Sequence, residues 1–229
     1  MRVAILQFPG SNCDWDSEHA VADILDVPAA RIWHKDKLPS ETEAVIVPGG
    51  FSFGDYLRCG AIARFSPIMN DLKEFSEKGG QVLGICNGFQ ILCESGLLPG
   101  ALIRNECIDF RCLNQELKVE DSNEYFNTKI LGKKLVLPIA HGEGNFRADE
   151  ATLSSLEEND QILLRYESNP NGSMNDIAGI RNSTGNVYGM MPHPERAVAP
   201  HHPCLDGLPV LKAFLAPLLT SRPTEISSS

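Results

Sequence analysis

The chain has 229 residues, of which 42% are hydrophobic and 22% are charged, so its composition is that of a globular protein rather than a disordered or fibrous one. Its 30 acidic and 20 basic residues give a formal net charge of −10, and without a Lys/Arg run this argues against nucleic-acid binding. No segment has the pattern of a membrane span or a signal peptide, so we expect no membrane association and a place in the cytoplasm.

Seven cysteines are spread along the chain, at positions 13, 59, 86, 93, 107, 112 and 204. An odd number without the spacing of a secreted domain favours free thiols in a reducing compartment over disulfides. The nearest approach to a metal-binding pattern is the proline-rich segment that holds His201, His202 and Cys204. Short His/Cys tracts are commonly plain loop, because tight zinc sites use four spaced ligands. We therefore expect no metal in this chain and assign no role to these three residues.

Short runs of β-branched and aliphatic residues, bounded by glycine or proline, recur in the first half of the chain. They are Val3–Leu6, Ala44–Val47 and Val82–Ile85, with helical stretches between them. Strands that alternate with helices predict βαβ units. We therefore expect an α/β fold with a mostly parallel central sheet that is flanked by helices.

Two helices are expected, one before and one after the predicted strand Val82–Ile85. Between Asp55 and Lys78 the apolar spacing is roughly helical, and two glycines follow Lys78, which is typical of a helix end. After Asn87 the apolar residues recur with the period of a helix that buries one face.

The segment from 101 to 166 has a different pattern. Its strand candidates, Ile108–Leu113, Leu135–Ile139 and Ile162–Tyr166, are separated by polar loops rather than long helices, so we expect some antiparallel pairing. Leucines between 208 and 219 have helical spacing. Because no linker or repeat is evident, we expect residues 1–229 to form a single domain with a frayed polar tail at 221–229.

The segment Gly84-Ile85-Cys86-Asn87-Gly88 lies between a predicted strand and a predicted helix. This is the context of the G-x-S-x-G nucleophile elbow, here with cysteine in place of serine. The sharp turn requires small neighbours, and it places the thiol over the helix N-terminus, where the helix dipole favours the thiolate. Taken alone, the motif also fits a buried structural cysteine between two packing glycines.

A base for such a nucleophile is available at His193, which Glu195 follows two residues later, just beyond the strand candidate Asn186–Met190. In an extended segment these two side chains project to the same side, so the carboxylate can hold the imidazole tautomer that accepts the thiol proton. A solvated histidine in a proline-rich surface loop is the alternative.

A third element is Pro48-Gly49-Gly50-Phe51, directly after the strand Ala44–Val47. Backbone without side chains can approach a ligand closely and point N–H groups at it. The backbone N–H groups of Gly50 and Asn87 could then stabilise the oxyanion that forms when a thiolate attacks a carboxamide. A simple turn is the alternative for this segment.

Together these motifs resemble the class I glutamine amidotransferases with a Cys-His-Glu triad, and among them the family of glutaminase subunits of phosphoribosylformylglycinamidine synthase. The matching stretches are FPGSNCD (8–14), PGGFSFGDYLR (48–58), GICNGFQ (84–90), PIAHGEGNF (138–146) and MMPHPER (190–196). The resemblance implies a role for each site residue: Cys86, His193 and Glu195 form the triad, Gly50 and Asn87 supply the oxyanion donors, and Gln90 lies in the glutamine pocket.

The resemblance also implies the reaction and the partners. The Cys86 thiolate attacks glutamine, a glutamyl thioester forms, and the ammonia supplies the ATP-dependent conversion of formylglycinamide ribonucleotide to its amidine in purine biosynthesis. This chain has no GxxxxGK[ST] loop, so we expect no cofactor here. ATP and magnesium are expected on a large synthetase subunit, which works together with a small accessory subunit.

Two other functions remain open at this point. A stand-alone amidase of the Cys-elbow class would share the fold and the triad, and a binding or regulatory module would carry a silent triad. The intact Cys86, His193 and Glu195 argue against a silent module. Labelled glutamine separates all three, since only a glutaminase yields glutamate and a thioester at Cys86.

Overall fold

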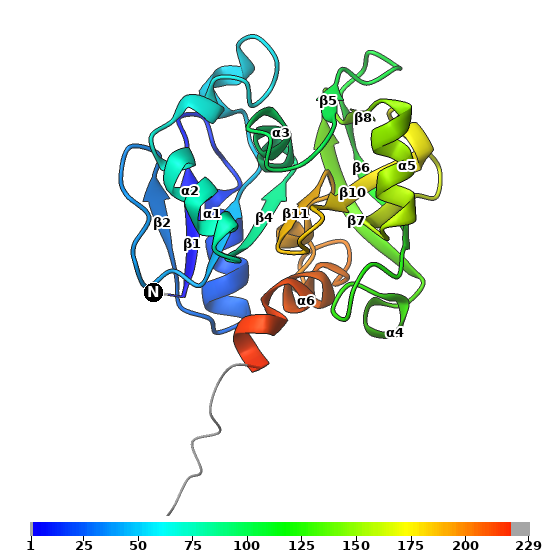
Figure 1. Ribbon diagram of the computed structural model, residues 1–229. Coiled ribbons are helices and arrows are strands. Elements are labelled where there is room, and N and C mark those ends of the chain that lie inside the picture. The colour runs from blue at the N-terminus through cyan, green and yellow to red at the C-terminus, as the bar shows by residue number, and fades with distance from the viewer. Residues whose placement is uncertain (1, 221–229) are drawn as a thin grey trace, which may run out of the picture.

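The computed structural model describes residues 2–220, which form an α/β fold around one mixed nine-stranded sheet (Figure 1). The strand order is β2-β1-β3-β4-β11-β10-β9-β6-β7. The strands are β1 Val3–Gln7, β2 Ala29–Trp33, β3 Ala44–Val47, β4 Gln81–Ile85, β6 Arg111–Val119, β7 Lys134–His141, β9 Ile162–Tyr166, β10 Ile177–Arg181 and β11 Val187–Met190. A separate antiparallel pair is made by β5 Ala101–Ile103 and β8 Asn145–Arg147.

The sheet has a parallel part and an antiparallel part. Strands β2, β1, β3, β4 and β11 pair in parallel, whereas β11, β10, β9, β6 and β7 pair antiparallel. Every residue of β3 and β11 is buried, as expected for strands covered on both faces. These observations confirm the expected α/β class, with a parallel part from β2 to β11 and the expected antiparallel pairing, which runs from β11 to β7.

Helices flank the sheet (Figure 1). They are α1 Asp14–Glu18, α2 Ile68–Glu77, α3 Asn87–Glu94, α4 Thr128–Leu131, α5 Glu150–Glu158 and α6 Gly207–Thr220, and a π-helical segment, His19–Ile24, continues α1. Among residues 2–220, none of the helices has the length and apolarity needed to cross a membrane. The frayed tail that was expected at 221–229 lies outside the described residues.

Two of the predicted elements begin well before the observed ones. The predicted strand Ile108–Leu113 begins only at Arg111, because Ile108 has a φ of 66° and its side chain is 66% exposed. The predicted helix from Asp55 to Lys78 is helical only from Ile68 onward apart from a short 3₁₀ turn, since Asp55 has a φ of 53° and a helix needs negative values. Apolar spacing alone could not separate a buried helix face from an exposed apolar loop.

Helix α3 packs directly against β3 through a glycine. A Cβ at Gly88 would overlap the backbone oxygen of Val47, whereas a Cβ at Gly142 would meet only the Phe110 ring, at 3.7 Å.

We expect Gly88→Ala to destabilise the fold, because the backbones of α3 and β3 must separate to admit the methyl group. Overpacking of this kind costs about 1–3 kcal/mol, which corresponds to a fall in Tm of roughly 2–12 °C for a chain of this size. The measurement is thermal unfolding by circular dichroism. Gly142→Ala is the matched control and should keep the Tm of the wild type; an equal Tm for Gly88→Ala would contradict the packing argument.

Candidate active site

Cys86 occupies the turn between β4 and α3 in a strained backbone conformation. Its φ of 49° and ψ of −105° lie outside the regions that residues with a side chain normally adopt. The neighbours at both flanks must be small: a Cβ at Gly84 would lie 2.8 Å from the Gly88 backbone, and Gly88 itself contacts Val47. This is the geometry of a nucleophile elbow, with the cysteine as the N-terminal cap of α3.

The surroundings of the thiol come from the ends of three strands. The Cys86 backbone N–H donates to the Met190 carbonyl at the end of β11, at 2.7 Å, and the Cys86 Sγ lies 3.6 Å from the Ala140 carbonyl oxygen in β7. The residue is only 5% exposed. The thiol therefore lies at the carboxyl edge of the parallel strands, where ligands bind in open α/β sheets.

His193 and Glu195 form a buried pair just beyond β11. His193 Nδ1 lies 2.6 Å from Glu195 Oε1, and each residue is 2% exposed. The prediction that this segment is extended is wrong, because Pro194–Arg196 forms a 3₁₀ turn with proline in its first position. The pairing arises because this tight turn folds the carboxylate back toward the imidazole.

The charge environment favours the protonated form of His193. Burial by itself would lower the pKa of the imidazole, but the Glu195 carboxylate and the thiols of Cys86 and Cys13 outweigh burial and hold the pKa well above its usual value. The pair therefore stabilises an imidazolium, which is the form that donates a proton to a leaving group.

The imidazole and the cysteine meet at Gly49. A methyl group at Gly49 would lie 2.8 Å from His193 Cε1 and 3.4 Å from Cys86 Cβ, so only a glycine fits between them. His193 Nε2 is buried and has no hydrogen-bond partner among the described residues. The structure thus brings Cys86, His193 and Glu195 together around the end of β3, with one ring nitrogen held by the carboxylate and the other free for a proton.

The two expected oxyanion donors border the same turn. Gly50 has a φ of 132°, a conformation that favours glycine, and a Cβ there would lie 2.7 Å from the backbone nitrogen of Asn12. Asn87 begins α3, and its side-chain oxygen accepts from the Ser52 backbone N–H at 3.1 Å. This bond ties the loop after β3 to the elbow, so the two backbone segments that carry the candidate donors are held together.

Gln90 lies one turn further along α3 and is 4% exposed. Its side-chain oxygen accepts from Asn87 Nδ2 at 2.8 Å, and its Nε2 donates to the Glu143 carbonyl at 2.6 Å. Both ends of the amide are therefore engaged within the chain. The expected contact of Gln90 with glutamine stays a prediction, and its observed contacts join α3 to the loop after β7.

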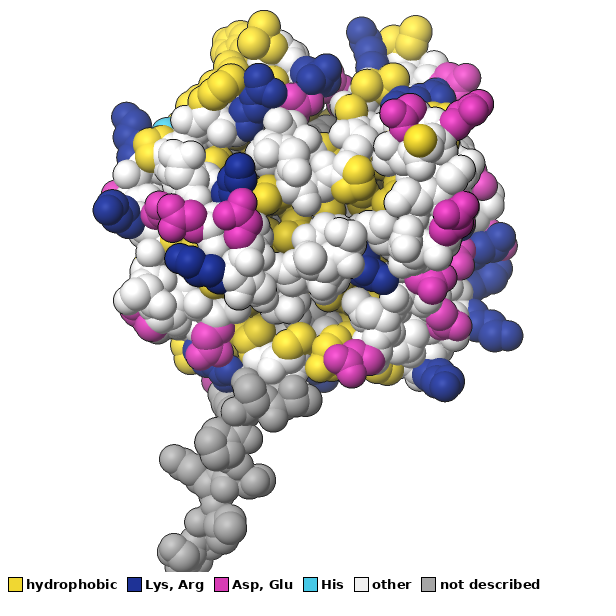
Figure 2. Space-filling model, in the orientation of Figure 1, with side chains coloured by type: hydrophobic (Ala, Val, Ile, Leu, Met, Phe, Trp, Pro, Cys, Tyr) yellow, Lys and Arg dark blue, Asp and Glu magenta, His cyan; other side chains and the backbone are white. Residues whose placement is uncertain are grey.

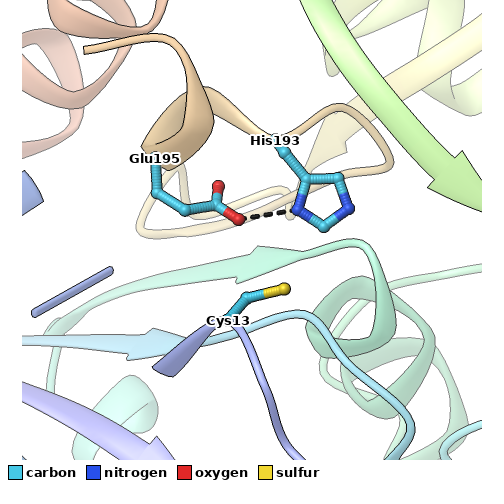
Figure 3. A group of neighbouring side chains, drawn as sticks. All are labelled: Cys13, His193 and Glu195. Carbon is cyan, nitrogen blue, oxygen red and sulfur yellow. Dashed lines mark hydrogen bonds and ion pairs between the residues drawn. The ribbon is translucent and has the colours of Figure 1, made fainter. Parts of the chain in front are cut away.

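Sequence reasoning missed a second thiol in the site. The Cys13 Sγ, the His193 ring nitrogen and the Glu195 carboxylate oxygen lie within 4.8 Å of one another, and Figure 3 shows the thiol pointing toward the pair. Cys13 is 2% exposed. The only signal in the sequence was its place in the stretch FPGSNCD, which carried the family resemblance but suggested no contact with His193.

A second histidine was also missed. His141 ends β7, and its Nδ1 lies 3.2 Å from Asn105 Oδ1. Burial, with a smaller effect of His193, lowers the pKa of His141 to about 4, so this imidazole is neutral at physiological pH.

The segment with His201, His202 and Cys204 forms no joint site. The His202 ring accepts from the Val198 backbone N–H at 3.0 Å, and the Cys204 thiol donates to the Val136 carbonyl at 2.9 Å. Among residues 2–220, the one cluster of possible metal ligands is the group that contains Cys13.

Comparisons with known proteins point to one family. Residues 1–203 match the model of the CobB/CobQ-like glutamine amidotransferase domain. The chain is 55% identical to the phosphoribosylformylglycinamidine synthase subunit PurQ of Synechococcus elongatus, over 95% of this chain and 99% of that one. The protein of the same name from a Nostoc species is 54% identical, over 94% and 97% of the two chains.

Solved structures agree with these relatives. A chain in the structure of PurLQS from Thermotoga maritima superposes with a TM-score of 0.85 at 40% identity, covering 95% of this chain and 98% of that one. A glutamine amidotransferase from Thermotoga maritima superposes with a TM-score of 0.59 at 15% identity, covering 96% and 83% of the two chains, which shows a shared fold alone.

We expect Glu195→Gln to move the basic limb of the pH profile of glutamine hydrolysis to lower pH. Without the carboxylate, burial dominates and the pKa of His193 falls, so the proton donor is lost at a lower pH. The rate should fall less than in His193→Ala, because an orienting carboxylate fixes the tautomer while the imidazole moves the proton.

The measurement is kcat/KM for glutamate release between pH 5 and 10, with Asp16→Asn as the control. Asp16 Oδ2 accepts from Nε of Arg196, the residue that follows Glu195, at 2.9 Å. The control should keep the wild-type limb. An unshifted limb in Glu195→Gln would contradict the assigned electrostatic role.

Proposed function

The chain belongs to the family of CobB/CobQ-like glutamine amidotransferases, and from this premise we propose that Cys86, His193 and Glu195 are its catalytic triad and that it is the glutaminase subunit of phosphoribosylformylglycinamidine synthase. The observation that carries the proposal is the strained cysteine at the start of α3, beside a buried histidine whose other nitrogen is held by a carboxylate. The near-full-length similarity to proteins of that name supports this function.

The proposed reaction has two steps that use the same histidine. The Cys86 thiolate attacks the side-chain carbonyl of glutamine, and the protonated His193 gives its proton to the departing ammonia. Neutral His193 then takes a proton from water, which attacks the glutamyl thioester and releases glutamate. Glu195 stabilises the imidazolium and holds the tautomer in both steps.

The oxyanion of each step would be bound by the backbone N–H groups of Gly50 and Asn87. Loss of one such donor typically costs about a hundred- to thousand-fold in rate. The hydrogen bond from Ser52 to Asn87 supports this role, since it fixes the distance between the two segments.

The ammonia would be used by a partner that carries ATP and magnesium. We assign both to the large synthetase subunit, which works together with a small accessory subunit, and no cofactor to this chain. Free ammonia in water at neutral pH is mostly protonated and not nucleophilic, so docking against the synthetase is required for efficient transfer. The seven free cysteines support a place in the cytoplasm, where thiols stay reduced.

An exposed apolar segment beside the site supports docking to the synthetase. Tyr56 is 74% exposed, Leu57 84% and Phe65 72%, all on the loop that follows β3 and carries Gly50. Figure 2 shows hydrophobic side chains gathered at the top of the molecule, where Figure 1 places this loop. Exposed apolar patches of this kind mark protein-protein contacts.

We expect Cys86→Ala to abolish synthesis with glutamine while the reconstituted complex still works with added ammonium salt, because only ammonia release needs the thiol. The measurement is product formation by the complex with each nitrogen donor. The same substitution at the buried Cys93 should leave both activities in place. Equal loss with both donors in Cys86→Ala would contradict the proposal.

We expect Leu57→Ser to weaken association with the synthetase by about fivefold or more, since truncation of a well-placed interface residue costs more than about 1 kcal/mol. The measurement is Kd by calorimetry or interferometry. Ile130→Ser is the matched control, because Ile130 is 52% exposed but lies on α4, at the opposite end of the molecule (Figure 1). Equal affinities for both variants and the wild type would rule out this docking surface.

A further inference from the structure

The cluster of Cys13, His193 and Glu195 has the ligand types of a zinc site. Thiolate, imidazole and carboxylate are the three side-chain groups that bind this cation in proteins. Their ligand atoms lie within 4.8 Å of one another, and all three residues are buried (Figure 3). The groups come from two distant parts of the chain, the start of α1 and the turn after β11.

The cluster also contains a buried polar atom without a partner. Glu195 Oε2 has no hydrogen-bond partner among the described residues, although Oε1 of the same carboxylate lies 2.6 Å from His193. Buried carboxylate oxygens normally accept hydrogen bonds or bind cations, because an unpaired buried charge is costly. The triad alone therefore leaves one oxygen of its carboxylate unused.

We propose that this cluster is an inhibitory site for zinc or a similar divalent cation, held by Cys13 Sγ, His193 Nδ1 and the Glu195 carboxylate, and that the bound metal stops glutamine hydrolysis. This inference rests on the proposed glutaminase function and adds a means of regulating it. Three protein ligands leave a fourth position for water, as in open zinc sites.

The geometry needs only small movements. Zinc bonds of about 2.0–2.3 Å separate tetrahedral ligand atoms by roughly 3.5 Å. His193 Nδ1 and Glu195 Oε1 must therefore move apart from 2.6 Å as the metal replaces the proton between them. Rotation of the carboxylate would bring the unpartnered Oε2 within reach.

The bound metal would inhibit hydrolysis because it changes which nitrogen of His193 carries a proton. Metal binding removes the Cys13 proton and the Nδ1 proton of His193. A neutral imidazole bound through Nδ1 keeps its remaining proton on Nε2, so it can no longer accept one from Cys86 or from water. Because the thiol and the imidazole must both lose a proton to the metal, binding competes with protons, and we expect tighter binding as pH rises.

A spectroscopic test does not depend on activity. We expect Co²⁺ added to the reduced full-length chain to give the sulfur-to-cobalt charge-transfer absorption of a bound thiolate. This absorption should be lost in Cys13→Ser and kept in Cys93→Ser and Cys86→Ser. Absorption that survives in Cys13→Ser, or is absent from the wild type, would overturn the proposed ligand set.

The functional test measures glutamate release by the wild type across a Zn²⁺ titration, with reversal by a chelator. We expect half-inhibition of Cys13→Ser to need at least about tenfold more Zn²⁺ than the wild type or Cys93→Ser. Equal sensitivity of Cys13→Ser would show that the metal acts on Cys86 alone and would overturn the inference. If the metal-free wild type releases no glutamate, alone or with its partners, the proposed function is refuted. The cobalt absorption would still show whether Cys13, His193 and Glu195 bind a metal.

Discussion

The site depends on the sharp turn between β4 and α3. The turn holds Cys86 at a φ of 49°, and it can form only because glycine stands two residues away on each side. Contact of Gly88 with Val47 then brings α3 against β3, which sets where the loop with Gly50 begins. The strain at one residue is thus balanced by packing over two strands and a helix, and the same packing places the candidate oxyanion donors beside the thiol.

Burial and charge act against each other at His193. Burial favours a neutral ring, but the Glu195 carboxylate at 2.6 Å and the nearby thiols favour the cation, and their sum leaves the pKa well above its usual value. The neighbouring His141 contacts the uncharged amide of Asn105 instead, and burial lowers the pKa of its ring. Two histidines at one site therefore differ in charge because one contacts a carboxylate and the other an amide.

Much of the fold and of the candidate site could be predicted from the sequence, for local reasons. The strands Ala44–Val47 and Ile162–Tyr166 have the predicted bounds because their apolar runs end at turn-forming or polar residues. The elbow was predictable because its glycines are neighbours in sequence. The loop that begins at Asp55 could not be predicted, since its exposed apolar residues have helical spacing but form no buried face. Cys13 was missed because its contact with His193 spans most of the chain and depends on how β1 and β11 lie in one sheet.

The two thiols at the site have different surroundings, since Cys86 is the N-terminal cap of α3 and Cys13 is buried beside His193 and Glu195. Glu195 stabilises the imidazolium of His193, whereas burial raises the pKa of the Cys13 thiol. Cys13 is therefore held as a neutral thiol, which donates to Asn12 Oδ1 at 3.2 Å, next to a charged ring. A neutral thiol is a poor nucleophile, so the burial of Cys13 keeps this second cysteine from competing with Cys86. A divalent cation that displaces the thiol proton would bring Cys13 into its anionic form, so the proposed metal could use this second thiol.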